Sequence, residues 1–303
     1  MRTRSTILRC AAAGAAAFAL GAPAGAAALE DCPEQPQPQI LRSGPGTLES
    51  IGVDRKGRIF YTEIDAGSLL RLRDDGRERT LVSGIDGPGG IVFQRRNLLV
   101  GFGNSYAQAL DGPLDPQGGL LRVDPRSGRS RVFAEGLQMA NGIARGPDGQ
   151  IFASNALGTG IDRIQGGAVE VNWASGVTSP NGLAVSADGR YLFASQTATP
   201  GIQRIPLDDP GAASAWYTGT VADAVAGLDG MERGPDGAMY VAANGAGQVW
   251  RVSGPGEACV LLRRSAFPDG PSDVAFTRGR GFRDGTLLVT TWGGEILALP
   301  GVA

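Results

Sequence analysis

The feature that most constrains the fold is a short sequence pattern that the chain repeats. Each copy joins an apolar segment to a second one through a turn, most often Asp-Gly. Copies start at positions 49, 89, 141, 181, 229 and 272, so the spacings are 40, 52, 40, 48 and 43 residues. A period of this length predicts an array of one supersecondary unit, here six times over. Four copies begin with an oxygen-bearing side chain: Glu49, Asn141, Asn181 and Asp229.

Each unit is composed of short strand-forming segments. Unit one contains Ile51–Asp54, Ile59–Glu63, Leu69–Arg73 and Arg79–Ser83, separated by turns at 55–57 and 74–76. The glycines of these turns supply the positive φ that tight hairpins need. No segment keeps a 3.6-residue apolar period over a dozen positions, which argues against helices. Four short antiparallel strands per unit predict an all-β fold, a six-bladed β-propeller.

The two ends of the repeat region predict how the ring closes. After Ser272 only three strands are evident, at Asp273–Phe276, Thr286–Thr291 and Glu295–Leu299. A lone strand, Gln39–Arg42, precedes unit one. We expect it to pair with Glu295–Leu299 and to complete the last blade, because this removes an open sheet edge.

The first 28 residues are typical of a secretory signal peptide. Three arginines at positions 2, 4 and 9 precede an apolar run from Cys10 to Leu20, and small residues end at Ala28. We expect cleavage near Ala28 and export to the periplasm or the medium, with residues 29–303 forming one propeller domain. No other segment approaches 18 uninterrupted apolar residues, so no membrane span is expected after cleavage.

The charge of the mature chain restricts its partners. Residues 1–28 contain three arginines and no acids, which leaves 25 basic against 30 acidic residues and a net charge of −5. Lys56 is the single lysine. A mildly acidic surface argues against nucleic acid or anionic membrane as partner. We expect a monomer that acts on a small molecule.

Two cysteines remain after signal cleavage, Cys32 and Cys259. An even pair in an exported chain indicates a disulfide, although two separate buried thiols are the alternative. Cys32 precedes the closing strand, and Cys259 falls in the expected outer strand of blade five. A bridge between them would lock the ring closure.

The four oxygen-bearing side chains are expected to meet on the propeller axis. Equivalent positions in radially arranged blades point at the same axis, so Glu49, Asn141, Asn181 and Asp229 converge at one mouth of the channel. Two carboxylates and two amides favour a hard divalent cation, and we expect Ca²⁺ ahead of Mg²⁺, Mn²⁺ or Zn²⁺. The alternative interpretation is that Asn-Gly and Asp-Gly only form the turns that start these strands.

The chain resembles the senescence-marker-protein/gluconolactonase/luciferin-regenerating-enzyme family of six-bladed propellers. The resemblance covers residues 39–300 and rests on Glu49-Ser50, the Asn-Gly pairs at 141 and 181, and Asp229-Gly-Met before a Pro-Asp-Gly turn. It implies a divalent cation held by residues matching these four. Two departures stand out. Position 89 is glycine, and Gln138-Met-Ala-Asn141 replaces an Arg and Asn pair of many sugar lactonases, so the resemblance does not extend to sugar specificity.

The absence of histidine narrows the chemistry further. It excludes Ser-His-Asp and Cys-His nucleophile systems and a His-ligated zinc. We therefore expect metal-dependent hydrolysis of lactones or related esters, in which the cation polarises the carbonyl. Asp229 would act as general base or as nucleophile, while Glu49 and the asparagines hold the ion.

Loops between the second and third strands of the blades should open on the same face as the channel mouth. The longest, residues 104–118, is a candidate lid. Five loop residues are candidate substrate contacts: Asn104, Asn155, Gln196, Asn244 and Trp292. Two other functions stay open, a non-catalytic propeller that binds a ligand or protein with a structural ion, and a strictosidine-synthase-like condensing enzyme.

Overall fold

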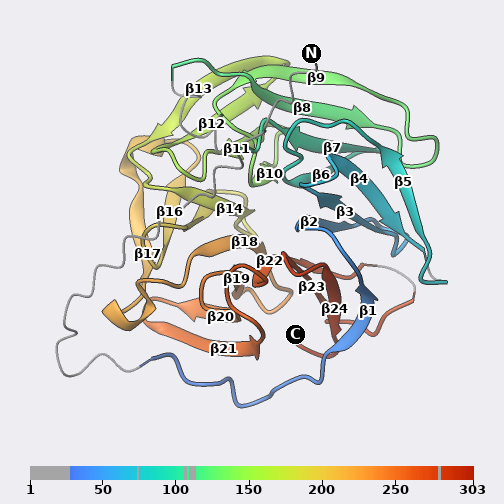
Figure 1. Cartoon of the computed structure of the whole chain (residues 1–303). Coiled ribbons are helices and arrows are strands. Elements are labelled where there is room, and N and C mark those ends of the chain that lie inside the picture. The colour runs from blue at the N-terminus through green and yellow to red at the C-terminus, as the bar shows by residue number, and fades with distance from the viewer. Residues whose placement is uncertain (1–27, 74, 106–107, 109–113, 279–280) are drawn as a thin grey trace, which may run out of the picture.

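Six four-stranded antiparallel sheets surround a central axis in the computed structural model, so the predicted six-bladed β-propeller is confirmed (Figure 1). The structure describes residues 28–73, 75–105, 108, 114–278 and 281–303. Blade one contains β2 Leu48–Val53, β3 Ile59–Glu63, β4 Ser68–Leu72 and β5 Glu78–Val82. Blade two contains β6 Ile91–Gln94, β7 Asn97–Phe102, β8 Gly118–Val123 and β9 Ser130–Leu137. Blade three contains β10 Ile143–Arg145, β11 Ile151–Ser154, β12 Gly160–Gln165 and β13 Ala168–Ser175.

The remaining three blades follow the same order from the axis outward. Blade four contains β14 Pro180–Val185, β15 Tyr191–Gln196, β16 Gly201–Pro206 and β17 Ser214–Thr218. Blade five contains β18 Leu228–Arg233, β19 Met239–Ala243, β20 Gln248–Gly254 and β21 Glu257–Arg263. Blade six contains β22 Pro271–Phe276, β23 Leu287–Thr291, β24 Glu295–Leu299 and β1 Gln39–Ser43. Two short 3₁₀ turns, Pro210–Ala212 and Val221–Asp223, lie in loops.

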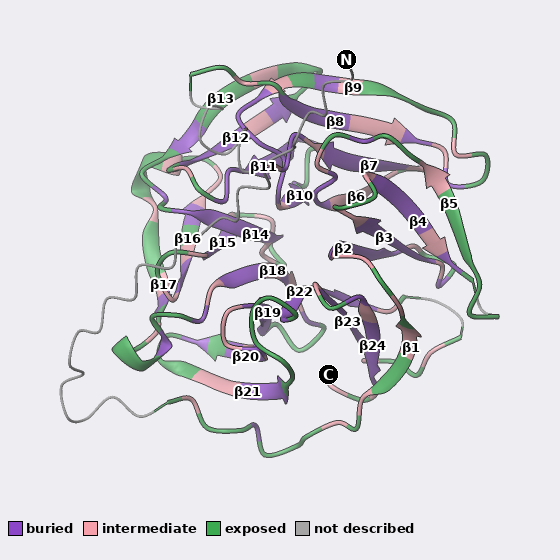
Figure 2. Ribbon diagram, in the orientation of Figure 1, coloured by how far each residue is buried: buried purple, intermediate pink, exposed green. Residues whose placement is uncertain are grey.

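The apolar core lies between neighbouring sheets. Phe60 and Leu69 of blade one pack with Leu98 and Val100 of blade two, and similar clusters join the other blades. The inner strands and their neighbours are buried, whereas the outermost strands are largely exposed (Figure 2). Outer strands alternate apolar and polar residues because one of their faces meets solvent. Inner strands are covered by neighbouring blades and carry longer apolar runs. The packing fixes the inner strands and hence the residues at the axis.

The N-terminal strand closes the ring as predicted. β1 pairs antiparallel with β24, with Gln39 opposite Ala298 and Ser43 opposite Glu295 (Figure 1). One strand from the beginning of the chain therefore completes a sheet formed by its end. This pairing removes the free edge that blade six would otherwise expose.

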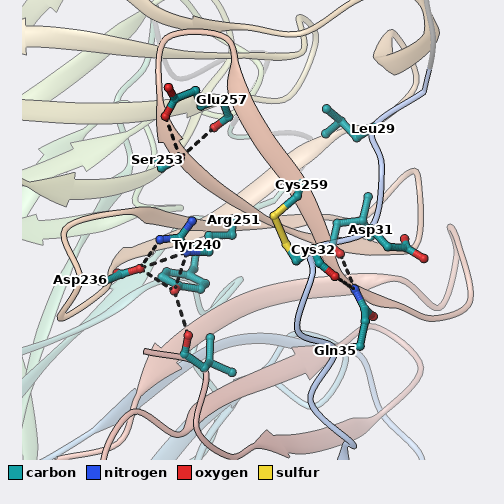
Figure 3. The surroundings of a disulfide bond; sticks show 12 residues. Leu29, Asp31, Cys32, Gln35, Asp236, Tyr240, Arg251, Ser253, Glu257 and Cys259 are labelled. Carbon is teal, nitrogen blue, oxygen red and sulfur yellow. Dashed lines mark hydrogen bonds and ion pairs between the residues drawn. A yellow bond between two sulfur atoms is a disulfide. The ribbon is translucent and has the colours of Figure 1, made fainter.

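A disulfide joins Cys32 to Cys259, so the predicted bridge is confirmed and the alternative of two separate thiols is wrong (Figure 3). The peptide around it also hydrogen-bonds to β21. The Cys32 N–H donates to the Val260 carbonyl, and the Val260 N–H donates to the Glu30 carbonyl, both at 2.8 Å. The N-terminal segment thus ties the outer edge of blade five before it reaches blade six.

Two predictions fall on residues outside the described ranges. The signal peptide at 1–28 covers residues 1–27, and the candidate lid at 104–118 includes residues 106–107 and 109–113. Among the described residues no helix has the length and apolarity needed to cross a membrane.

Candidate functional site

The inner strands of all six blades line a central cavity of about 370 Å³. Each strand contributes consecutive residues along its length, so the cavity follows the propeller axis. The four oxygen-bearing residues predicted to meet there all line it: Glu49, Asn141, Asn181 and Asp229. All four are buried, with between 5% and 8% of each residue's surface exposed. The structure therefore brings the predicted set together.

Local irregularities turn three of these side chains toward the axis. The strand register shifts between Leu48 and Ile51 in β2, between Pro180 and Leu183 in β14, and between Leu228 and Met231 in β18. Glu49, Asn181 and Asp229 each lie inside such a shift. A bulge of this kind removes residues from the ladder and redirects a side chain. Asn141 instead lies in the turn just before β10.

Glu49 is the most heavily hydrogen-bonded of the four. Its Oε1 accepts from the amide nitrogens of Asn104 at 2.8 Å and Asn141 at 3.0 Å, and its Oε2 accepts from the indole N–H of Trp292 at 3.0 Å. The Asn141 amide also donates to Asn104 Oδ1 at 2.9 Å. None of these partners is basic, so the carboxylate is held by neutral donors alone.

Asn104 fills the place of the missing lead residue of blade two. A side chain at position 89 would overlap the Ala140 carbonyl, which explains why this repeat begins with glycine. Asn104, from the loop after β7 of the same blade, instead contacts Glu49 of blade one and Asn141 of blade three. Blade two therefore contributes a polar group from its loop.

Asp229 lies beside Asn181, whose side chain hydrogen-bonds its carboxylate. Burial raises the pKa of Asp229 well above its usual range, and the charges of Glu49 and Asp273 raise it further. Burial also raises the pKa of Glu49, against the hydrogen bonds from Asn104, Trp292 and Asn141 that lower it. A cation bound between the two buried carboxylates would offset the repulsion between their negative charges.

The donor set fits a divalent ion if the amides of both asparagines turn. Two carboxylates and amide oxygens are the ligands of hard cations. Within the described ranges there is no group of three or more His, Cys, Asp or Glu side chains placed to hold a metal. The candidate set differs from such a group because amides supply half of it. The amide nitrogen of Asn141 faces Glu49, and that of Asn181 faces the Asp229 carboxylate. Both Oδ1 atoms would therefore have to turn toward an ion.

Sequence analysis missed two further acids in the cavity, Asp273 and Glu232. Asp273 accepts from the backbone N–H groups of Ile51 at 3.0 Å and Val274 at 2.8 Å. Burial raises its pKa to about 7, against those two hydrogen bonds. Glu232 forms an ion pair with Arg278 at 2.9 Å. Alignment of the repeats contains the signal. Asp273 and Glu232 occupy positions where the other copies carry mostly Gly, Ser or Ala: Ser50, Gly142, Gly182, Gly52, Ala144 and Ala184.

The five candidate substrate contacts divide into two groups. Asn104 and Trp292 reach Glu49, and the exposed Phe267 ring contacts Trp292 edge to face with centroids 5.9 Å apart. The other three candidates are buried and make local contacts. Gln196 donates to the Thr178 carbonyl, Asn244 donates to the Gly270 carbonyl, and Asn155 Oδ1 accepts from the Leu157 N–H. None of the five candidates lines the cavity itself; Asn104 and Trp292 reach only Glu49, which does.

Comparison with known proteins agrees with the resemblance predicted from the sequence. Residues 153–293 match the SMP-30/Gluconolactonase/LRE-like region. The chain is 23% identical over 237 residues to lactonase drp35 of Staphylococcus aureus strain USA300, covering 73% of this chain and 70% of that protein.

Solved structures share the fold at low sequence identity. A gluconolactonase from Xanthomonas campestris is 16% identical with a TM-score of 0.68, covering 92% of this chain and 99% of that one. The calcium-binding protein regucalcin from Agrobacterium tumefaciens is 19% identical with a TM-score of 0.66, covering 88% and 94%. A virginiamycin B lyase from Staphylococcus aureus, inactivated by a histidine-to-alanine substitution, is 16% identical with a TM-score of 0.60, covering 88% and 99%.

Proposed function

We propose that this chain, which carries the SMP-30/gluconolactonase/LRE-like region, is an exported, divalent-metal-dependent hydrolase of lactones or related esters. The observation that carries the proposal is the buried pair of mutually repelling carboxylates, Glu49 and Asp229, set among amide groups on the axis. The relatives support the reaction class, since one is a lactonase and a similar fold belongs to a gluconolactonase. Ca²⁺ is the expected ion, in line with the calcium-binding neighbour.

The ligands of the ion would be Glu49, Asn141, Asn181 and Asp229. A divalent cation at this place supplies a Lewis acid for the substrate carbonyl and favours negative charge on its oxygen. The chain's own contribution is to hold the ligands rigidly. Asn104 donates a hydrogen bond to Oε1 of Glu49 at 2.8 Å, and Trp292 donates one to Oε2 at 3.0 Å, so both oxygens are held in place. All four residues are largely buried and line the central cavity.

Asp229 is the proposed reactive carboxylate. It takes a proton from water as general base, or attacks the carbonyl carbon as nucleophile. Its neighbour Gly230 has no side chain, and a Cβ there would overlap Asp273. Glu49 is less suited to the reactive role because three donors occupy its two oxygens. Single turnover in H₂¹⁸O separates the two roles, since only a nucleophilic Asp229 gains the label in its carboxylate.

A histidine-dependent reaction is not available to this chain. The virginiamycin B lyase of similar fold loses activity when a histidine becomes alanine, and this sequence contains no histidine. The proposed chemistry accordingly uses carboxylates and an ion. The two alternatives kept from the sequence, a binding propeller and a condensing enzyme, predict no lactone hydrolysis.

A substrate panel tests the proposal. The purified mature protein is assayed against aliphatic, aromatic and sugar lactones and aryl esters, with Ca²⁺ and then with a chelator. We expect hydrolysis of at least one lactone class that the chelator abolishes and added Ca²⁺ restores. Absence of hydrolysis across the panel, with Ca²⁺ bound, would instead favour a non-catalytic propeller.

A further inference from the structure

Two buried serine hydroxyls connect the three consecutive blades that carry Asn141, Asn181 and Asp229. Ser154 ends β11 in blade three, and Ser195 lies near the end of β15 in blade four. Both side chains are fully buried. We propose that these serines are positioning residues, which set the spacing of the three candidate ligands. The inference rests on the proposed function, because it assigns a task relative to that site.

Ser195 links blade four to blade five. Its Oγ accepts from the Gly182 N–H at 2.8 Å and donates to the Asp229 carbonyl at 2.6 Å. Gly182 directly follows Asn181, so one hydroxyl bonds the backbone beside one candidate ligand and the backbone of the next. A second hydroxyl reinforces the link, since Thr197 accepts from the Asn181 side chain and donates to the Leu228 carbonyl.

Ser154 makes the same pair of contacts one blade earlier. Its Oγ accepts from the Gly142 N–H at 2.9 Å and donates to the Asn181 carbonyl at 2.6 Å. Gly142 follows Asn141. Ser154 and Ser195 therefore form a chain of hydrogen bonds that runs from Asn141 through Asn181 to Asp229.

The strand irregularities explain why hydroxyls are needed at these places. The register shifts in β14 and β18 take backbone groups near Asn181 and Asp229 out of the strand ladders. Buried N–H and C=O groups require hydrogen-bond partners, and leaving one unpaired is destabilising. The hydroxyl that satisfies them also couples two blades. The register shift that turns the candidate ligand toward the axis therefore also frees the backbone groups to which the serine hydroxyl bonds.

The residue at the equivalent position differs between the repeats. Thr62 in blade one occupies the equivalent position, accepting from Ser50 N–H and donating to the Gly89 carbonyl. In blade five the position is Ala242, one residue beyond the Met231–Val241 pair. A threonine therefore makes this contact within the same fold, which provides a conservative replacement for Ser195.

Calcium binding to the mature protein tests the inference. Ser195→Ala, Ser195→Thr and wild type are titrated with Ca²⁺ by calorimetry, with Ser68→Ala as the matched control. Ser68 is also a buried serine, but its hydroxyl donates to the loop carbonyl of Ala66 at 3.0 Å. We expect Ser195→Ala to weaken Ca²⁺ binding about tenfold, the effect of one lost hydrogen bond at the site. Ser195→Thr and Ser68→Ala should bind like wild type.

Ca²⁺ affinity in Ser195→Ala equal to that of wild type overturns the inference, whatever the loss of stability. Ser154→Ala gives the same test if Ser195→Ala does not fold. Should wild type bind no Ca²⁺, the proposed function has failed, and amide hydrogen exchange at Gly182 then decides the serine contact separately. Faster exchange in Ser195→Ala but not in Ser195→Thr supports it. Unchanged exchange contradicts it.

Discussion

At the level of single residues, the two buried carboxylates on the axis have different environments. Glu49 is held by Asn104, Asn141 and Trp292, whereas Asp229 faces the charge of Glu49 and borders on a glycine. The first arrangement suits a ligand that stays in place. The second suits a group that changes its protonation during a reaction.

Asp229→Asn tests this division. The variant keeps one ligand oxygen and most of the packing but removes the base, so turnover should fall by roughly 10²–10⁴ at saturating Ca²⁺.

Asn181→Ala should instead weaken Ca²⁺ binding, and excess Ca²⁺ should partly restore its activity. Steady-state kinetics at several Ca²⁺ concentrations distinguish the two. Near-normal turnover of Asp229→Asn at saturating Ca²⁺ would show that Asp229 is only a ligand.

Asp273 predicts the pH dependence of stability without metal. Its pKa in the folded protein is about 7, above the value near 4 of an exposed aspartate. The folded state therefore binds the proton more tightly, and the stability that this contributes is present below pH 4 and is lost as the pH rises through 7. Chelated wild type should show a falling melting temperature from pH 5 to pH 8.

Asp273→Asn is the matching variant. It cannot ionise, so its melting temperature should change less with pH over the same range. Its single side-chain oxygen replaces the two that accept from Ile51 and Val274 N–H, so its stability at pH 5 should be lower than that of wild type. An unchanged slope would show that Asp273 does not titrate there.

At the scale of elements, the repeat pattern predicted the strands because each strand is short, apolar and bounded by a glycine turn. The same regularity concealed the bulges. Nothing in Glu49-Ser-Ile-Gly-Val shows that the ladder skips between Leu48 and Ile51, since that depends on the neighbouring blade. Asp273 and Glu232 were missed for a related reason. Both replace mostly small residues at the second and fourth positions of their repeats, whereas the predicted ligands all occupy the first position.

The aromatic pair Phe267 and Trp292 belongs to two loops, one that joins blade five to blade six and one within blade six. Phe267 is 63% exposed and contacts Trp292, which donates to Glu49. We expect an apolar part of the substrate to contact this pair. Phe267→Ala should raise KM for an aromatic lactone several-fold and leave kcat nearly unchanged, because it removes binding common to ground and transition states. Val171→Ala, an exposed apolar control on outer strand β13, should change neither.

At the scale of the whole molecule, sequence alone predicted the ring, its closure and the disulfide. These features follow from the number of strands and of cysteines, and neither number changes when a strand boundary is misplaced by a residue or two. The hydrogen bonds among Glu49, Asn104 and Trp292 join blades one, two and six. Contacts of that kind follow from packing and not from spacing, so sequence could name the candidates but not select those that reach the site.

The disulfide should matter for stability and not for the site. It closes a loop with a sequence separation of 227 residues, and the loop-entropy model gives about 5 kcal/mol as an upper value. Cys32→Ser with Cys259→Ser should therefore lower the free energy of unfolding by a few kcal/mol. Ca²⁺ affinity should not change, because the bridge lies on outer strand β21 (Figure 3). Chemical denaturation and calorimetry on the same samples measure both, and a shared loss would contradict the separation.

The central claim is that ion binding at the axis and lactone hydrolysis are one property of this protein. The most direct measurement titrates metal-free wild type with Ca²⁺ while recording binding by calorimetry and hydrolysis of the best panel lactone. The two curves should coincide, and Asp229→Asn should keep measurable Ca²⁺ binding but lose hydrolysis. Hydrolysis that persists without any divalent ion, or that stays absent when Ca²⁺ is bound, would contradict it.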